Sequence, residues 1–233
     1  MIVALNNKSN LTKQEFITYQ QQLQQINTTH KLILCPTTLY LEDVTISNVE
    51  LGAQNVSCTN QGAYTGETAA IQLKSLEVSY CIVGHSERRK YQQETNEQIR
   101  EKIIQLLKEK ITPILCIGES QDEREQQLEQ QVITKQLEEA TTNLSEEEKK
   151  KIIIAYEPIW SIGTGVIPTN EEIESMVNTI KQHFPSNKVL YGGSANVENI
   201  DIIKQVSNID GYLLGGLSLH PEQLQIFLEK LKN

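Results

Sequence analysis

Eight short apolar runs recur along the chain, and longer segments of mixed polarity separate them. The runs lie at 1–5, 31–36, 49–56, 79–85, 112–119, 151–157, 188–194 and 210–216. Most of them lack the in–out alternation of a strand with one solvated face, and such continuity is typical of parallel strands covered on both faces. The pattern therefore predicts eight buried parallel strands.

The segments between these runs carry apolar residues at helical spacing. The clearest, 94–110, places Ile99, Ile103, Leu106 and Leu107 on one face. Others lie at 13–26, 124–141, 171–183, 197–206 and 221–232. Strands that alternate with helices imply βαβ crossovers. Eight repeats without a break in composition favour an α/β fold, a single (β/α)8 barrel domain over residues 1–233 with its strands ringed by helices, over an open sheet.

Composition and charge narrow the class of protein. The chain is 38% apolar and 22% charged, as in an ordinary folded protein. A net charge of −9 argues against a nucleic-acid partner, and there is no polybasic patch for a membrane. No apolar run approaches the roughly 20 residues that span a bilayer, and the N-terminus lacks the pattern of a secretion signal. We expect a cytoplasmic protein with neither nucleic-acid nor membrane partners. An anionic substrate stays compatible, since distant surface charges are screened.

The four cysteines show no C-x-x-C spacing. They are Cys35, Cys58, Cys81 and Cys116, and three of them lie within or at the end of apolar runs. Buried free thiols in a reducing compartment are therefore favoured over a metal site or disulfides.

In a barrel of this type the active site lies in the loops after the carboxyl ends of the strands. Polar residues and glycines gather at these predicted ends. They are Asn6 and Lys8 after the first run, His85 and Glu87 at the fourth, Glu119 at the fifth, Glu157 at the sixth, YGGS (191–194) at the seventh and Gly215–Gly216 at the eighth.

Glu157 and the segment that follows it form the first candidate for chemistry. Partial removal from water beside apolar walls strengthens a carboxylate as a base, although a helix cap or an ion pair is the alternative for a lone glutamate. The next segment, PIWSIGTGVIP (158–168), carries Gly163 and Gly165 near its tip and is stiffer at both ends. Glycines let a backbone move and let its N–H groups approach a ligand, so we interpret the segment as a lid rather than a simple connector.

His85 and Lys8 are the candidates for handling developing negative charge. His85 lies where the fourth strand gives way to an expected helical turn, and the positive end of a helix dipole favours a neutral imidazole that donates a hydrogen bond. Lys8 is the obvious cation among the strand ends apart from Arg88 and Arg89. Taken singly, a structural histidine and a solvated lysine are the alternatives.

Two glycine pairs, in YGGS (191–194) and LLGGLS (213–218), end the last two runs. In α/β barrels a phosphate commonly binds at these two strand ends, held by backbone N–H groups that glycine leaves accessible. Together with a glycine-tipped lid, the pairs indicate a phosphate cradle rather than tight packing alone.

With these residues in place, the sequence closely resembles the triosephosphate isomerase family over nearly the whole chain. The segments that carry the resemblance are AYEPIWSIGTG (155–165), VGHSERR (83–89), YGGS (191–194), GYLLGG (211–216), CIGE (116–119), GAQNV (52–56) and GAYTGE (62–67). The resemblance implies a TIM barrel and an aldose–ketose isomerase of glycolysis and gluconeogenesis. It would interconvert dihydroxyacetone phosphate and D-glyceraldehyde 3-phosphate by proton transfer through an enediolate, with no metal or other cofactor.

The resemblance also implies a role for each matching residue. Glu157 would be the carbon-directed base, His85 the neutral electrophile and Lys8 the cation that stabilises the oxyanion. Asn6 would make a further polar contact to the substrate, and Glu87 would be a network partner near the lysine. Gly163 would be a lid amide on the phosphate, whose remaining donors are Ser194, Gly215 and Gly216. Ile162 and Leu213 would enclose the carboxylate and exclude water.

The family is dimeric, and the matching interface segment is SCTNQGAYTGE (57–67). Its tip would place Thr65 beside the partner's Asn6 and the partner's Glu87. The resemblance thus implies a homodimer that shapes its own active sites.

Several positions depart from the family's usual pattern. They are Leu5, Asn7, Gln93 and Leu217, which replace glycine, tryptophan, glycine and a small residue, and a Val166-Ile167-Pro168 hinge in place of one that lacks proline. None removes a reacting group. Because proline fixes φ, we expect the hinge to alter the opening rate of the lid.

Two alternative functions account for part of the pattern. Another phosphate-binding barrel enzyme, such as a phosphoribosyl isomerase, would explain the glycine pairs but not Lys8, His85 and Glu157 at these strand ends. A binding or scaffold protein that has lost catalysis would explain the altered first strand and hinge. The retention of all three reactive groups counts against it.

Overall fold

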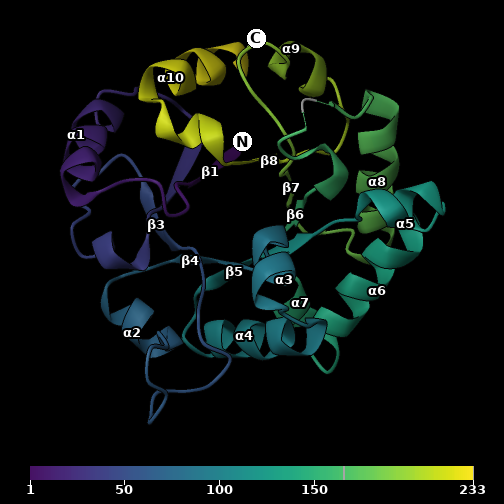
Figure 1. Cartoon of the computed structure of the whole chain (residues 1–233), viewed down its shortest axis with the longest axis horizontal. Helices are drawn as coiled ribbons and strands as arrows, with labels where there is room; N and C mark the ends of the chain where they lie inside the picture. Colours follow the sequence, from purple (N-terminus) through teal and green to yellow (C-terminus); the bar gives the residue numbers. More distant parts are fainter. Residues whose placement is uncertain (165, 233) are drawn as a thin grey trace.

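The structure is a computed structural model that describes residues 1–164 and 166–232. Eight parallel strands form a closed barrel in sequence order, and helices surround it (Figure 1). The strands are β1 (Ile2–Asn6), β2 (Lys31–Cys35), β3 (Glu50–Ala53), β4 (Tyr80–Val83), β5 (Thr112–Ile117), β6 (Ile153–Tyr156), β7 (Val189–Tyr191) and β8 (Gly211–Leu214). β1 pairs with β8, with Ile2 opposite Gly211, and so closes the ring. The (β/α)8 prediction is confirmed.

Ten α-helices and three short 3-10 helices occur among the described residues. The α-helices are α1 (Lys13–Leu23), α2 (Ala70–Ser75), α3 (Ser86–Gln92), α4 (Asn96–Lys108), α5 (Gln121–Glu125), α6 (Glu129–Thr141), α7 (Glu146–Lys149), α8 (Asn170–His183), α9 (Ile200–Ile203) and α10 (Pro221–Lys230). The 3-10 helices are η1 (Thr38–Tyr40), η2 (Ile159–Ser161) and η3 (Gly216–Leu219). The helices predicted at 94–110 and 171–183 correspond to α4 and α8.

The predicted helix at 124–141 is divided in the structure. Gln127 has a φ of 57°, in the left-handed region, and this conformation ends a helix, so α5 stops before α6 begins. The helix predicted at 197–206 is reduced to α9. The sequence pattern also gave no sign of α2 and α7, because helices of one or two turns are too short to show a 3.6-residue period.

Local sequence sets where many of the helices begin. Thr12, Thr95, Ser120, Ser145 and Thr169 each cap a helix, and a Glu or Gln three residues later closes a reciprocal hydrogen bond. Such capping boxes satisfy backbone N–H groups that have no partner inside the helix. The helices therefore start at defined residues, and the preceding βα loops have defined lengths.

Two apolar layers explain the continuous apolar runs. Side chains such as Ile33, Ile82 and Leu190 fill the inside of the barrel. Alternate residues, such as Leu34, Val83 and Tyr191, pack outward against the helices. Because both faces of every strand are buried, the strands show no polar alternation. The observed strands are shorter than most of the runs, since the last residues of several runs turn into the loops at the mouth.

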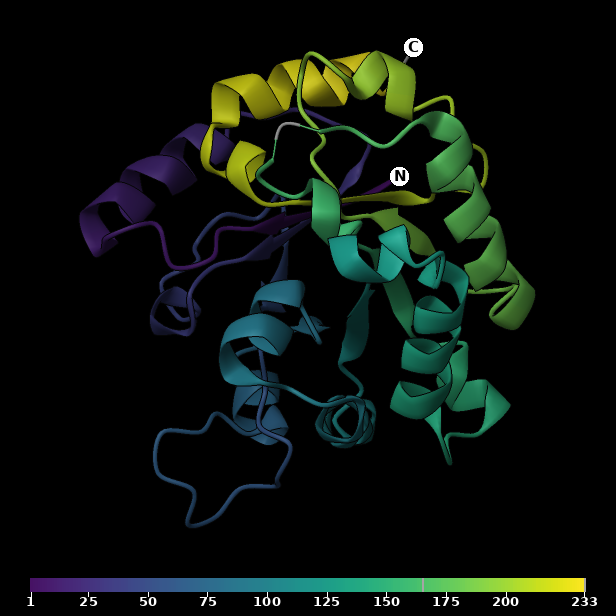
Figure 2. The ribbon, with the colours of Figure 1, turned by 45° about the vertical axis from the view of Figure 1, so that its right-hand side comes forward.

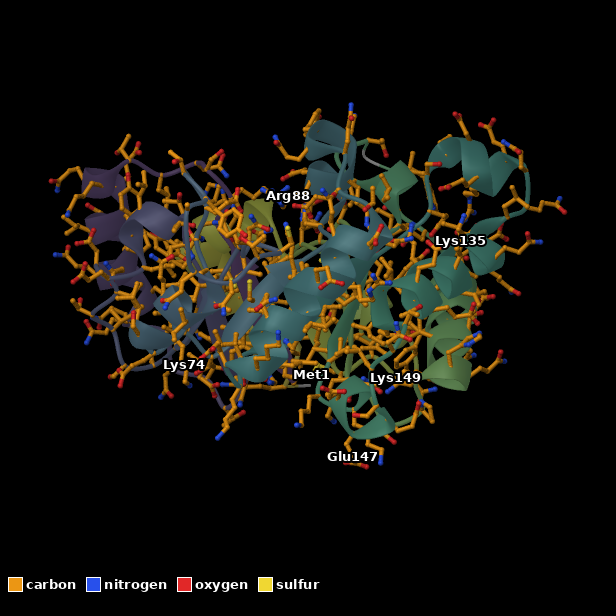
Figure 3. All side chains as sticks on the ribbon, turned by 90° about the horizontal axis from the view of Figure 1, so that it is seen from below. Met1, Lys74, Arg88, Lys135, Glu147 and Lys149 are labelled. Atoms are coloured by element: carbon orange, nitrogen blue, oxygen red, sulfur yellow. The ribbon has the colours of Figure 1, made fainter. Side chains whose placement is uncertain are left out.

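The segment 57–67 stands apart from this packing. It extends away from the barrel after β3 (blue in Figure 2), and residues 60–67 are exposed. Tyr64 and Thr65 lie within it. The side view in Figure 3 separates the two ends of the barrel, with Arg88 near one end and Met1 and Glu147 near the other.

The four cysteines form no disulfide among the described residues. All four cysteines are free, and Cys35, Cys81 and Cys116 are buried, whereas Cys58 is half-buried. Burial raises the pKa of the Cys35 thiol to about 12. Within residues 1–164 and 166–232, none of the helices has the length and apolar character needed to cross a membrane.

Candidate active site

A pocket of about 440 Å³ opens at the carboxyl ends of the strands. Among its lining residues are ten of the predicted site residues: Asn6, Lys8, His85, Glu157, Ile162, Gly163, Ser194, Leu213, Gly215 and Gly216. Glu87 lines an adjoining pocket of about 730 Å³ together with Asn6, Lys8 and His85. Thr65 lies outside both, in the exposed part (60–67) of the segment 57–67. The closure of the barrel thus gathers residues that are up to 210 positions apart in the chain (6 to 216).

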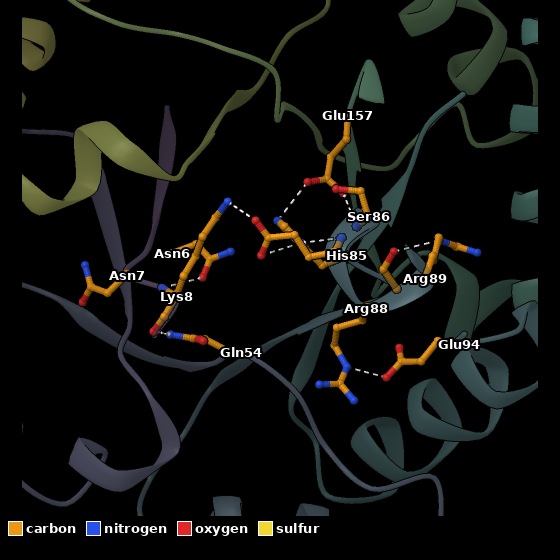
Figure 4. A network of polar contacts seen from close by, with 12 residues as sticks. Asn6, Asn7, Lys8, Gln54, His85, Ser86, Arg88, Arg89, Glu94 and Glu157 are labelled. Carbon is orange, nitrogen blue, oxygen red and sulfur yellow. Dashed lines mark hydrogen bonds and ion pairs between the residues drawn. The ribbon is translucent and has the colours of Figure 1, made fainter. Parts of the chain in front are cut away.

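Glu157 follows β6 directly and is almost fully buried. Its Oε1 lies 3.0 Å from His85 Nε2, and its Oε2 accepts a hydrogen bond of 3.0 Å from the Ser86 N–H (Figure 4). Gly118 and Gly192 pack against it so closely that a Cβ on Gly192 would lie 3.0 Å from Glu157 Cγ. Small neighbours therefore make room for a buried carboxylate that protein N–H groups hold in place.

His85 occupies the N-cap of α3. Its Nδ1 accepts a hydrogen bond of 3.3 Å from the Glu87 N–H, which requires that Nδ1 carry no proton. The proton of a neutral ring is then on Nε2, which points toward Glu157 and the pocket. The backbone of α3 thus selects the tautomer that donates into the site.

Lys8 lies two residues beyond β1 with a φ of 54°, a conformation that is uncommon for a residue other than glycine. Its carbonyl accepts a hydrogen bond of 2.8 Å from Gln54, and its N–H donates to Asn6 Oδ1 at 3.2 Å. Its Nζ lies 2.5 Å from Glu87 Oε1. The side chains of Asn6, at the end of β1, and of Gln54, directly after β3, thus hold the backbone of the strained turn, and the ammonium group reaches the pocket.

Three arginines are also near the mouth, and they have other partners. Arg88 pairs with the buried Glu94, which also contacts Lys102. Arg89 donates to the carbonyls of Gly84 and Cys116, and burial lowers the pKa of its guanidinium. The guanidinium of Arg124 lies 4.0 Å from the centre of the Trp160 ring. Of the cations predicted near the strand ends, Lys8 is thus the one that lines the 440 Å³ pocket.

Glu119, a polar strand-end residue with no predicted role, anchors the start of the candidate lid. It is fully buried, and burial raises the pKa of its carboxyl group. Its Oε1 accepts hydrogen bonds from Trp160 Nε1 at 2.7 Å and from Tyr156 Oη at 3.1 Å. It does not line the 440 Å³ pocket. Its contacts instead fix one end of the segment 158–168.

The segment 158–168 lies over the pocket through Ile162 and Gly163. Gly163 has a φ of 74°, which a side chain would disfavour. Gly165 lies outside the described residues. At the far end, Pro168 is buried and directly precedes Thr169, the N-cap of α8. Both ends of the candidate lid are therefore anchored, by Glu119 and by Pro168.

Sequence reasoning missed three polar residues of the same pocket, namely Asn196, His220 and Gln223. They lie beyond the glycine pairs rather than at the strand ends, so no motif pointed to them. The available signal for His220 was its position directly before Pro221, where a helix was predicted to begin. Among the described residues, no group of three or more His, Cys, Asp or Glu side chains is placed to hold a metal ion.

The sequence model of the family described as triosephosphate isomerase matches residues 1–231. The chain belongs to the triosephosphate isomerase family. A triosephosphate isomerase of Dictyoglomus turgidum is 38% identical over 95% of each chain, and that of Dictyoglomus thermophilum is 40% identical over 82% of each. A third, from Caldanaerobacter subterraneus subsp. tengcongensis, is 42% identical over 76% of this chain and 75% of the relative. The predicted resemblance, the isomerase function and the enzyme class are confirmed.

Among triosephosphate isomerases, the departures of this chain are local. Gln93 has a φ of 55° and ends α3, which explains why glycine suits that position. Leu5 is buried in the layer between barrel and helices, and Leu217 lines the pocket beside Gly216. Asn7 is buried and donates a hydrogen bond to Ser218 Oγ.

Proposed function

We propose that the chain interconverts dihydroxyacetone phosphate and D-glyceraldehyde 3-phosphate through an enediolate. The observation that carries the proposal is the convergence of Lys8, His85 and Glu157 on one pocket that glycine-rich backbone also lines. An amine, a neutral imidazole and a carboxylate are the groups that a proton transfer next to a carbonyl needs. The pocket volume of about 440 Å³ is ample for a triose phosphate.

Glu157 removes a proton from the carbon beside the carbonyl of the substrate. The electron pair of that C–H bond forms the double bond of the enediolate, and the carbonyl oxygen becomes an oxyanion. His85 Nε2–H and Lys8 Nζ stabilise this oxyanion, and Asn6 makes a further polar contact. A proton then moves from the hydroxyl oxygen on the first carbon to the oxyanion, and the Nε2 of His85 lies where it can relay this proton. Glu157 returns its proton to the former carbonyl carbon, and the oxygen that lost its proton becomes the new carbonyl oxygen. Glu87 steadies Lys8, to which it is paired at 2.5 Å.

The phosphate group binds at the other side of the pocket. Ser194, Gly215 and Gly216 line that side, and glycine lets the backbone N–H groups at the start of η3 approach an anion closely. Gly163 adds a donor when the lid closes. Closure brings Ile162 and Leu213 around the carboxylate, which excludes water and strengthens the base.

We extend the proposal to the assembly and the cellular location of the protein. It acts as a homodimer in the cytoplasm. Residues 60–67 of the segment 57–67 are exposed, and the adjoining pocket of about 730 Å³ is lined by Leu39 and Tyr91, which are 80% and 67% exposed. Insertion of this segment from a second copy would cover both and bring Thr65 to the partner's Asn6 and the partner's Glu87. Three buried free thiols are in keeping with a reducing compartment.

A coupled assay with glyceraldehyde 3-phosphate tests the chemistry. Glu157→Gln removes the base and should lower kcat by about 10² to 10⁴-fold. Glu146→Gln, on the exposed helix α7, is the matched control and should leave the rate unchanged. Equal rates for wild type and Glu157→Gln would reject the role of Glu157. Turnover of a phosphoribosyl substrate instead would favour the other barrel isomerase.

Sedimentation of the purified chain tests the assembly. A dimer of the 26.4 kDa chain is expected, and Thr65→Asp should weaken it by placing a charge at the tip of the inserted segment. A wild-type monomer with full activity would contradict the shared active site.

A further inference from the structure

Asn7 lies between two residues of the proposed active site, Asn6 and Lys8, yet it does not line the pocket. It is 2% exposed, and its side chain is turned away from His85 and Glu157 (Figure 4). A buried amide in this position needs a physical reason, because removing polar groups from water is unfavourable unless hydrogen bonds replace the lost hydration.

The Asn7 amide joins three parts of the chain. Its Nδ2 donates to Tyr19 Oη in α1 and to Ser218 Oγ in η3, each at 3.3 Å. Ser218 Oγ in turn donates to the carbonyl of Asn6 at 3.1 Å. Tyr19 and Ser218 are themselves buried. The end of β1 is therefore tied to η3, which follows it by more than 200 residues.

The oxygen of the Asn7 amide, in contrast to its nitrogen, makes no hydrogen bond among the described residues. This Oδ1 is nevertheless buried. An apolar side chain of similar size would avoid this unfavourable burial, so packing alone does not explain an asparagine here. The donor side of the amide, toward Ser218 and Tyr19, is what the structure uses.

Ser218 belongs to the segment that carries Gly215 and Gly216, the proposed phosphate donors. This segment lies directly against Lys8, since a Cβ on Gly215 would be 3.2 Å from Lys8 Cε and 3.5 Å from its Nζ. Lys8 has its own anchors in Gln54 and Glu87. A shift of η3 would therefore move the phosphate donors relative to a lysine that stays in place.

We propose that Asn7 is a positioning residue that holds the segment 215–218 against the end of β1 through Ser218. Its hydrogen bond sets the separation between the phosphate donors and the Lys8 ammonium, so that one triose phosphate reaches both. The inference rests on the proposed function. It concerns the phosphate-binding half of the site and leaves the proton-transfer groups where they are.

Asn7→Leu tests the proposal, because it keeps the volume and removes the donor. Loss of one hydrogen bond between buried groups should raise the Kd for inorganic phosphate, measured by calorimetry, by about 5- to 10-fold. The KM for glyceraldehyde 3-phosphate should rise in parallel. Turnover of unphosphorylated D-glyceraldehyde, which makes no use of the phosphate donors, should stay unchanged.

Matched variants separate positioning from stability. Ser218→Ala should reproduce the loss of phosphate affinity, and the double variant should be no weaker than either single one, because both break the same link. Tyr19→Phe removes the other acceptor and should leave phosphate affinity unchanged. Should Asn7→Leu fail to fold, Ser218→Ala still tests the link.

The proposal is overturned if phosphate binds Asn7→Leu and Ser218→Ala as tightly as wild type. It is equally overturned if both substrates lose activity alike, or if the two losses add in the double variant. Failure of the proposed function would look different, since the wild-type protein would then not isomerise glyceraldehyde 3-phosphate. Phosphate binding by calorimetry does not depend on turnover.

Discussion

The two ends of the barrel use charged residues in opposite ways. At the amino ends of the strands, Asp210 accepts hydrogen bonds from the Val189 N–H at 2.9 Å, from Lys188 at 3.0 Å and from Lys181 at 3.2 Å. Asn187 donates to two carbonyls, each at 2.7 Å. These groups satisfy one another, and none of them lines the pocket at the mouth.

At the carboxyl ends, polar groups contact one another and also face a shared space. Lys8 pairs with Glu87, and His85 lies 3.0 Å from Glu157, yet Lys8, His85 and Glu157 all line the 440 Å³ pocket. A ligand in this pocket can reach all three groups, whereas none of the groups around Asp210 lines it. The comparison indicates that one end of the fold is built for stability and the other for chemistry.

The largest expected effect is at the mouth. Lys8→Met removes the ammonium group and keeps most of the apolar stem, so kcat/KM should fall by about 10² to 10³-fold through lost stabilisation of the oxyanion. The free energy of unfolding should change by less than about 1 kcal/mol, because the Lys8–Glu87 pair is partly exposed. Steady-state kinetics measure kcat/KM, and urea unfolding measures the free energy of unfolding. A large loss in the free energy of unfolding without a loss in kcat/KM would mean that Lys8 serves stability rather than chemistry.

Asp210→Asn should have the opposite signature. Burial tends to raise the pKa of Asp210, but the Val189 N–H and the two lysines outweigh it, so that its pKa lies below the usual range. We expect a loss of about 1–3 kcal/mol in the free energy of unfolding at neutral pH, with kcat/KM unchanged.

The pH dependence of the same variant follows from the sign of the shift. Because the folded-state pKa is depressed, the stability that Asp210 contributes is present above its unfolded pKa of about 3.9 and is lost as pH falls through the lower folded value. The difference between wild type and Asp210→Asn in urea unfolding should therefore shrink in acid. A difference that grows in acid would contradict the pairing.

Pro168→Ala probes the hinge between the mouth and helix α8. Pro168 fixes φ directly before the N-cap Thr169, so its removal should change the opening rate of the lid. If opening limits turnover, kcat should change more than phosphate affinity. An unchanged kcat would remove the hinge from the rate-limiting step and leave the isomerase function untouched.

The smallest effect is expected from Lys188→Ala. Its ammonium group is one of three donors to Asp210, and its side chain is 61% exposed. Solvent screens such pairs, so thermal unfolding should show a loss of roughly 0–1 kcal/mol. A loss as large as that of Asp210→Asn would mean that the lysines, rather than the Val189 N–H, dominate the network.

Much of the fold and of the site was predictable, because the signals were local. Uninterrupted apolar runs identified buried parallel strands, and residues directly after them, such as His85 and Glu157, were necessarily at one end of a barrel. The division of the helix at Gln127 was not predictable, since a left-handed glutamine leaves no trace in periodicity. The hydrogen bond from the Ser86 N–H to Glu157 was not predictable either, because the two residues are 71 positions apart in the chain.

The sequence by itself determined the alternation of strands and helices, the end of the barrel at which chemistry is expected and the family to which the chain belongs. These follow from residue spacing and from short motifs, which are properties of neighbouring residues. Only the tertiary structure decided which tautomer of His85 faces the pocket, how Lys8 is held and what Asn7 links. Such contacts join residues far apart in the chain, and their geometry is set when the closure of the barrel brings β1 beside β8.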